Sequence, residues 1–191
     1  MFPIELSPVS LASASEIFEA IDAHREDLRV WLPFVDGLKT VADEERFLQS
    51  VFACPEEERD RMFIIRREGR FCGLIGYWGT VWKDHRTEIG YWLLPEYRHA
   101  GLMTRSVCAL CRYAVEALGM NAVRIHCAAG NMASNAVPQR LGFTREGTER
   151  EGELLLGGVY ADIHVYSILR REVLSPDFLR KAKEANVYIS E

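Results

Sequence analysis

The stretch YWLLPEYRHAGLMT, residues 91–104, combines residue types that bind anions. Its apolar start predicts a strand, Pro95 ends that strand, and Arg98 and Gly101 stand where an amphipathic helix begins. The first turn of a helix exposes unpaired backbone N–H groups and a partial positive charge. Glycine lets the backbone approach a ligand closely, and arginine offers a planar cation for phosphate oxygens. The stretch predicts a phosphate or pyrophosphate site, with an ordinary helix start as the alternative.

A second polar pattern, NMASNAVPQRLGF, follows the next predicted strand. It places Asn131 and Ser134 about thirty residues beyond Gly101. The first stretch is not a Walker loop, because no G-K-[ST] follows, and it lacks the G-x-G-x-x-G of dinucleotide-binding folds. The strand before it belongs to an antiparallel meander, which also argues against a doubly wound sheet.

The two patterns together resemble the signatures of the GCN5-related N-acetyltransferase (GNAT) superfamily: R-x-x-G after one strand and N-x-x-S…G-F after the next. The segments EIGYWLLPEYRHAGLMT and REGELLLGGVYADIHVYSIL are similar to the RimJ/RimL branch, which acetylates ribosomal-protein N-termini. The resemblance covers roughly residues 1–170, and residues 171–191 are expected to form a C-terminal helical extension. Met103 and His99 replace small residues of the signature, so their side chains must point away from a cofactor.

The resemblance implies an α/β (α+β) GNAT fold: a mixed, mostly antiparallel central sheet of about seven strands, with a splayed central pair and flanking helices. It implies acetyl-CoA as the cosubstrate and no metal. The cofactor is expected between the strand ending at Leu94 and the strand ending near Ala128. The residues implied in cofactor binding are Trp92, Leu93, Leu94, Arg98, His99, Ala100, Gly101, Leu102, Met103, Thr104, Asn131 and Asn135. A backbone N–H near Leu93 is expected to hold the developing oxyanion.

Direct acyl transfer needs a neutral amine, a polarised thioester and a proton for the departing thiolate. Ser134 is expected to protonate or hydrogen-bond the sulfur, and the alternative is a hydroxyl that caps a helix. Glu153 and Glu88 are the two candidate bases, each able to act through water. Cys127 lies at the end of the strand expected beside the thioester and could approach the sulfur of CoA, but a buried strand residue is the favoured interpretation.

The sequence indicates the acceptor less directly than the cofactor. The leading hypothesis is a protein or peptide N-terminal α-amine, as on a ribosomal protein, with Trp31 and Phe34 lining the acceptor groove. Alternatives are a small amine such as a polyamine, an amino sugar or an antibiotic, and a non-catalytic CoA-binding module. The RimJ/RimL branch often forms homodimers, so a homodimer is also expected.

The elements that must position these residues follow from hydrophobic periodicity. Strands are predicted at residues 4–6, on both sides of a turn at Glu68-Gly69, at 87–94, at 122–128, from 143, and at 160–169. Helices are predicted at 13–23, at 43–54, at 101–118 and within 131–143, with a broken helix from residue 24 and an added helix in the tail.

Composition excludes several classes of protein. The chain has 191 residues and a net charge of −5, with no basic stripe to neutralise nucleic-acid phosphates. It shows neither a signal-peptide pattern nor an apolar run long enough to cross a membrane, which predicts a cytoplasmic protein. Cys108 and Cys111 form a C-x-x-C inside a predicted helix with no second ligand pair, so core packing is favoured over a zinc site.

Overall fold

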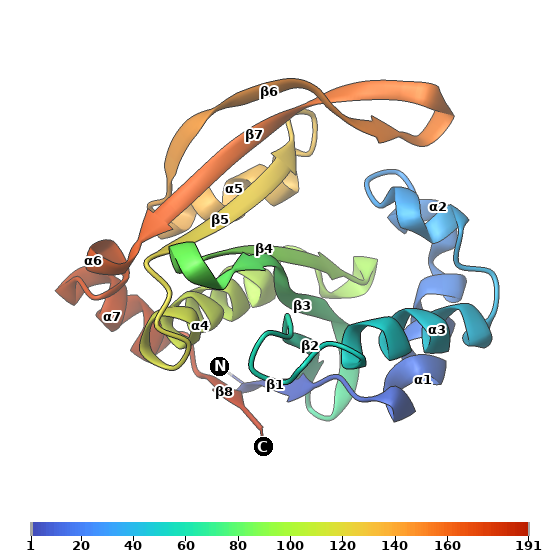
Figure 1. Ribbon diagram of the computed structural model, residues 1–191, viewed down its shortest axis with the longest axis horizontal. Helices are drawn as coiled ribbons and strands as arrows, with labels where there is room; N and C mark the ends of the chain where they lie inside the picture. The colour runs from blue at the N-terminus through green and yellow to red at the C-terminus, as the bar shows by residue number, and fades with distance from the viewer. Residues whose placement is uncertain (1, 191) are drawn as a thin grey trace.

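The computed structural model describes residues 2–190 and contains one mixed sheet with helices on both faces (Figure 1). The eight strands are β1 Ile4–Pro8, β2 Met62–Arg67, β3 Arg70–Val81, β4 Arg86–Leu93, β5 Ala122–Ala128, β6 Thr144–Leu155, β7 Val159–Leu169 and β8 Val187–Ile189. The seven α-helices of this described part are α1 Ala14–Ala23, α2 Arg25–Leu28, α3 Val41–Phe52, α4 Leu102–Glu116, α5 Met132–Leu141, α6 Arg170–Val173 and α7 Pro176–Glu184.

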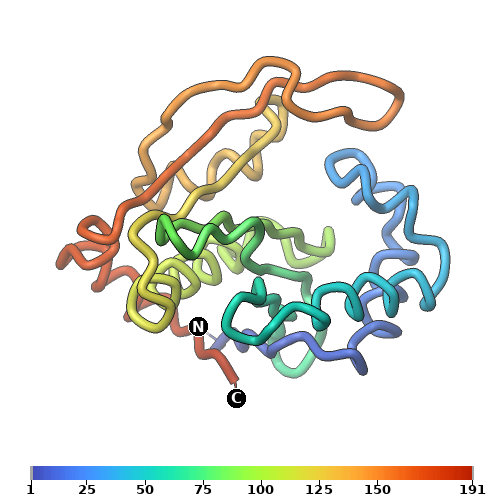
Figure 2. Tube along the Cα trace, viewed as in Figure 1, coloured from blue at the N-terminus to red at the C-terminus, as the bar shows by residue number. Residues whose placement is uncertain are grey.

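The strand order in the sheet is β6-β7-β5-β4-β3-β2-β1-β8. Only β4 with β5 and β1 with β8 run parallel, and the other neighbours are antiparallel. The parallel pairing of β4 with β5 is short: it joins residues 86–88 to residues 122–124. Beyond Glu88 the two strands diverge, and the β6–β7 hairpin arches over one side of the opening (Figures 1 and 2). The predicted GNAT fold with its splayed central pair is confirmed.

Helices cover the sheet because each presents an apolar stripe to it. Helix α4 buries Val107, Leu110, Cys111 and Ala114, which recur at helical spacing, and both C-x-x-C cysteines lie in this core. On the opposite face, α1 and α3 pack on a smaller core. Helix α3 begins with a capping box in which Thr40 accepts a hydrogen bond from the backbone N–H of residue 43.

The C-terminal segment contains the predicted added helix, α7, together with a strand that was not predicted. Helices α6 and α7 are followed by a short strand, β8, which pairs in parallel with β1 and extends the sheet from about seven strands to eight. Phe178 of α7 is 3% exposed and belongs to the main core. Arg105 of α4 donates to the backbone oxygens of Phe2 and Asn186, both at 3.1 Å. The segment is therefore integrated with the sheet, where a separate outer helix was expected.

The other predicted elements form within a few residues of their expected ends, including the turn at Glu68-Gly69 and helix α4. Within residues 2–190, no helix has the length and apolar character needed to cross a membrane.

Candidate functional site

The first turn of α4 lies at the open end of β4, where the anion-binding cradle is predicted. Gly101 adopts a left-handed conformation, with φ of 74°, and no side chain caps the helix. A Cβ on Gly101 would meet open space. The side chains of Leu102 and Met103 are buried in the core, at 2% and 7% exposure, and His99 is exposed. The Met103 side chain therefore points into the core and away from the proposed cofactor side of this turn, as the sequence analysis expects.

Arg98 has partners within the protein. Its guanidinium pairs with the carboxylate of Asp27 on α2, at 3.0 Å for one of the two contacts, and donates to the Leu93 carbonyl at 3.2 and 3.3 Å. The side chain thus ties α2 to the end of β4, next to the cradle. Its predicted contact with phosphate stays a prediction.

The edge of β4 that faces β5 carries free backbone groups. The Leu94 N–H donates to the Cys72 carbonyl at 2.9 Å, in register with the β3–β4 ladder. Because hydrogen-bonded pairs alternate along an antiparallel ladder, Trp92 and Gly90 also bond to β3, and the N–H groups of Tyr91 and Leu93 face the opening. An extended ligand can add to this edge as an extra strand would.

Three side chains meet where α5 follows β5. The Ser134 hydroxyl lies 3.1 Å from the sulfur of Cys127 and 3.3 Å from the phenol oxygen of Tyr91. Tyr91 also donates to the Ser134 carbonyl at 3.1 Å. Burial raises the pKa of the Cys127 thiol and of the Tyr91 phenol, so both stay protonated at neutral pH. The site offers a hydroxyl with a second hydroxyl behind it, a geometry suited to proton donation.

The two asparagines of this motif have structural partners. The Asn131 side chain accepts from the Ser134 N–H at 3.1 Å and caps α5, so Ser134 itself is not the cap. Asn135 is 3% exposed. Its NH₂ donates to the carbonyls of Ala128 and Asn131, and its oxygen accepts from Tyr166 and bonds to a ring nitrogen of His164. Asn135 therefore organises the turn after β5, and cofactor binding by these residues stays a prediction.

Glu88 is the last residue of β4 that pairs with β5, and it faces the opening. Its carboxylate lies 3.1 Å from His126 Nδ1 on β5. Burial raises the pKa of Glu88, the nearby His126 opposes that effect, and the charges of Glu149 and Glu153 on β6 add to it. Glu153 is exposed, and partial desolvation raises its pKa as well. The structure thus brings both predicted bases to one region, with Glu88 the more enclosed of the two.

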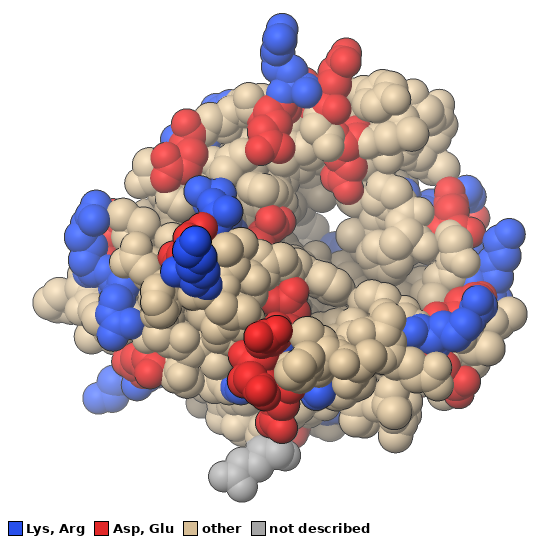
Figure 3. Space-filling view, viewed as in Figure 1, with Lys and Arg blue, Asp and Glu red and all other residues tan. Residues whose placement is uncertain are grey.

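A cavity of about 510 Å³ lies between the sheet and helices α1 and α3. Its wall includes the rings of Phe34, Phe47, Trp78 and Trp92 and the backbone around Gly90. The space-filling view shows a separate hollow between the β6–β7 hairpin and α2, with acidic side chains near its rim (Figure 3). Phe34 therefore lines the cavity next to α1 and α3, and its predicted role in acceptor binding stays a prediction.

Trp31 lies elsewhere. Its ring packs against Gly130, 3.4 Å from where a Cβ would stand, so it bridges from α2 to the turn after β5. It is not part of the cavity wall just described. Its predicted role in acceptor binding stays a prediction.

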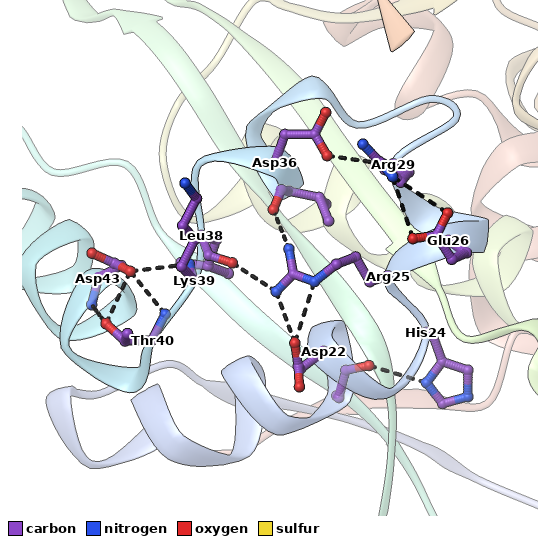
Figure 4. Close-up of polar contacts among 12 residues, drawn as sticks. Asp22, His24, Arg25, Glu26, Arg29, Asp36, Leu38, Lys39, Thr40 and Asp43 are labelled. Carbon is purple, nitrogen blue, oxygen red and sulfur yellow. Dashed lines mark hydrogen bonds and ion pairs between the residues drawn. The ribbon is translucent and has the colours of Figure 1, made fainter. Parts of the chain in front are cut away.

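The loop between α1 and α3 carries Trp31 and Phe34 and is fixed by charged side chains (Figure 4). Arg25 donates to the carbonyls of Val35 and Leu38, the latter at 2.7 Å, and pairs with Asp22 at 2.9 Å. Arg29 pairs with Asp36 at 2.8 Å. This network fixes the loop that carries Phe34 and so part of the cavity wall.

Sequence reasoning missed two residues of the site. The sequence pattern identifies Tyr91 only as part of a strand. Its contact with Ser134 joins two residues that are 43 positions apart in the sequence. Glu44 lines the cavity and is 4% exposed. Its spacing of four from the buried Leu48 places both on the inner face of α3, which was the available signal.

Comparison with known proteins identifies the family to which the sequence is related. A family model described as an acetyltransferase (GNAT) domain matches residues 4–144. A relative from Bacillus subtilis (strain 168) named "Putative ribosomal N-acetyltransferase YdaF" is 40% identical over 105 residues, which cover 55% of this chain and 57% of that protein. The ribosomal-protein-serine acetyltransferase of Escherichia coli (strain K12) is 24% identical over 164 residues, covering 86% of this chain and 91% of that protein.

Solved structures agree on the fold. A structure of the ribosomal-protein α-N-acetyltransferase RimL in complex with coenzyme A matches with a TM-score of 0.83 at 22% identity, covering 87% of this chain and 94% of that one. A structure described as a probable acetyltransferase matches with a TM-score of 0.82 at 29% identity, covering 89% and 94%. Because the family model spans more than half of the sequence, the chain belongs to the GNAT family of N-acetyltransferases.

Proposed function

We propose that the protein transfers acetyl directly from acetyl-CoA to a primary amine, and that the amine is the N-terminal α-amine of a protein or peptide. The observation that carries this proposal is the opening between β4 and β5, which has a free strand edge on one side and the α4 N-terminus at its mouth. Relatives named for ribosomal-protein acetylation and the CoA complex of RimL support the cosubstrate and the acceptor class.

The N–H groups of residues 102–104 would hold the pyrophosphate, with Arg98 supplying positive charge beside them. The pantetheine arm would add to the free edge of β4 through the backbone of Tyr91, because the Leu93 carbonyl already accepts from Arg98. The Leu93 N–H would then stabilise the oxyanion that develops on the thioester carbonyl.

Transfer forms a C–N bond and breaks the C–S bond. In the proposed reaction the neutral amine attacks the carbonyl carbon, and the surplus proton on nitrogen passes to Glu88, directly or through water. The Ser134 hydroxyl gives a proton to the departing thiolate and recovers one from solvent. Glu88 is preferred over Glu153 because it is more enclosed and lies against His126.

The first experiment is thermal unfolding with acetyl-CoA, ATP or NAD. At a hundredfold excess over Kd, specific binding adds about 2.7 kcal/mol to the free energy of unfolding. For a domain of this size, the midpoint should rise by roughly 5–10 °C. A rise with acetyl-CoA alone supports the cosubstrate, whereas a rise with ATP or NAD alone would contradict it.

The second experiment separates the acceptor classes. Peptides with free N-termini, the same peptides with blocked N-termini, and polyamines are incubated with acetyl-CoA, and products are detected by mass spectrometry. Acetylation of the free peptides alone supports the proposal. Acetylation of polyamines alone would move the protein to the small-amine class, and binding of acetyl-CoA without any turnover would favour a non-catalytic module.

A further inference from the structure

Glu44 is a buried carboxylate with no partner in the protein. It is 4% exposed, and it lines the 510 Å³ cavity between the sheet and α3. Across residues 2–190, no hydrogen bond or ion pair reaches its side chain, and burial raises its pKa to about 7. Carboxylates are seldom this buried unless they are paired, because desolvation penalises the charge.

The surroundings of Glu44 are apolar and aromatic. Phe47 and Trp78 stack with ring centroids 6.1 Å apart, and Trp92 forms another part of the wall. Asp43, the other carboxylate on the wall, is occupied elsewhere: it accepts from the Thr40 and Lys39 N–H groups at 2.8 and 3.0 Å, as Figure 4 shows. The cavity thus offers one uncompensated carboxylate beside aromatic faces, which complements an organic cation with an apolar stem.

We propose that Glu44 recognises the acceptor: it pairs with the cationic end of a lysine or arginine side chain close to the N-terminus of the acceptor peptide, while the apolar stem lies against Phe47 and Trp78. The inference rests on the proposed function, since it names which peptides that function selects. The same cavity reaches Gly90 and Trp92 on β4, so a peptide anchored there has its N-terminus near the opening. Glu44 acts here in recognition and takes no part in acyl transfer.

Binding is tested first without turnover. Hexylammonium and hexanol share an apolar stem and differ in charge, and their affinities can be followed by tryptophan fluorescence because Trp78 and Trp92 line the cavity. The wild type should bind hexylammonium at least tenfold more tightly than hexanol, and Glu44→Gln should abolish that preference. Glu45→Gln, the same change at the neighbouring exposed position, should retain it. Equal affinities in the wild type, or an unchanged preference in Glu44→Gln, would overturn the proposal.

Turnover then distinguishes this inference from the proposed function. Two peptides that differ only in lysine or norleucine at the second position are acetylated by the wild type and by Glu44→Gln. The wild type should prefer the lysine peptide at least tenfold in kcat/KM, and the variant should treat both alike. Equal kcat/KM values for both peptides in the wild type reject recognition by Glu44 and leave acetyltransfer standing. If neither peptide reacts, the proposed acceptor fails, and the fluorescence titration still decides whether Glu44 binds cations.

Discussion

Glu88 and His126 are residues from two different strands that meet where those strands part. In the proposed reaction Glu88 accepts a proton from the amine, and the contact of 3.1 Å with His126 Nδ1 gives that proton a path toward His126 or solvent. Burial raises the pKa of Glu88, so the ionised form that acts as a base appears at a higher pH than for an exposed carboxyl group. Catalysis through Glu88 should therefore weaken as the pH falls through that raised value.

Replacement of this base gives the first prediction. We expect Glu88→Gln to lower kcat/KM for a peptide acceptor by about 10²-fold at pH 8, the usual scale of general-base catalysis. The ratio of wild-type to variant activity should shrink toward one at acid pH, since Glu88 is then protonated in the wild type. Taking the ratio cancels the titration of the α-amine itself. Glu153→Gln is the matched comparison, and a larger loss there would assign the role to Glu153.

Glu44 gives a prediction about stability. Its pKa is about 7 in the folded protein and 4.5 in its ordinary state, and desolvation is the cause. Both states are protonated below 4.5. Between 4.5 and 7 the unfolded chain releases the proton while the folded chain keeps it, so the free energy of unfolding falls across that window by about 3 kcal/mol and then levels off.

The variant Glu44→Gln lacks this titration. Its midpoint of thermal unfolding should match that of the wild type near pH 4.5 and exceed it by roughly 5–10 °C at pH 8. Asp43 is the other carboxylate of the cavity wall, and it is held by Thr40 and Lys39 in both proteins. An equal midpoint at pH 8 would show that Glu44 ionises without cost.

At the scale of elements, helix α4 has a left-handed glycine at each end: Gly101, with φ of 74°, and Gly119, with φ of 69°. A Cβ at either position meets open space, so the same substitution carries the same backbone strain, about 1 kcal/mol. The two positions differ in their proposed role, because only Gly101 lies at the proposed pyrophosphate cradle.

We expect Gly101→Glu to weaken acetyl-CoA binding at least 100-fold, because a carboxylate then occupies the anion site. Gly119→Glu should lower thermal stability by a similar amount and leave the affinity unchanged. Isothermal titration calorimetry of both variants measures the difference. Equal affinities for acetyl-CoA would place the cofactor away from this helix.

Much of this level of structure could be predicted from local patterns. The periodicity of α4, the glycine turns and the cradle at Gly101 depend on residues close in sequence. Strand β8 could not be predicted in this way, because three residues are too few to show a hydrophobic periodicity. The strand forms only by pairing with the edge of β1. The contact of Tyr91 with Ser134 and the unpaired state of Glu44 depend on how distant elements pack, and periodicity holds no information about that.

For the whole molecule, the C-terminal segment contributes to the shared core. Phe178 of α7 is 3% exposed, whereas Leu174, four residues earlier, is 38% exposed. We expect Phe178→Ala to reduce the free energy of unfolding by about 3 kcal/mol, the usual cost of removing a buried phenyl ring. Leu174→Ala should cost less than about 1 kcal/mol. Urea denaturation measures both, and a small effect of Phe178→Ala would make residues 171–191 a separate appendage.

The parallel pairing of β8 with β1 also orders events during synthesis. Glu5 and Tyr188 lie side by side in this pairing although they are 183 positions apart. A ribosome adding about 5–20 residues per second makes β1 many seconds before β8 exists. Once β2 has paired with β1, the outer edge of β1 offers unpaired N–H and C=O groups to any neighbouring chain until β8 is made. Protection of the nascent protein against edge-to-edge association therefore depends on a strand that is translated after every other element of the fold.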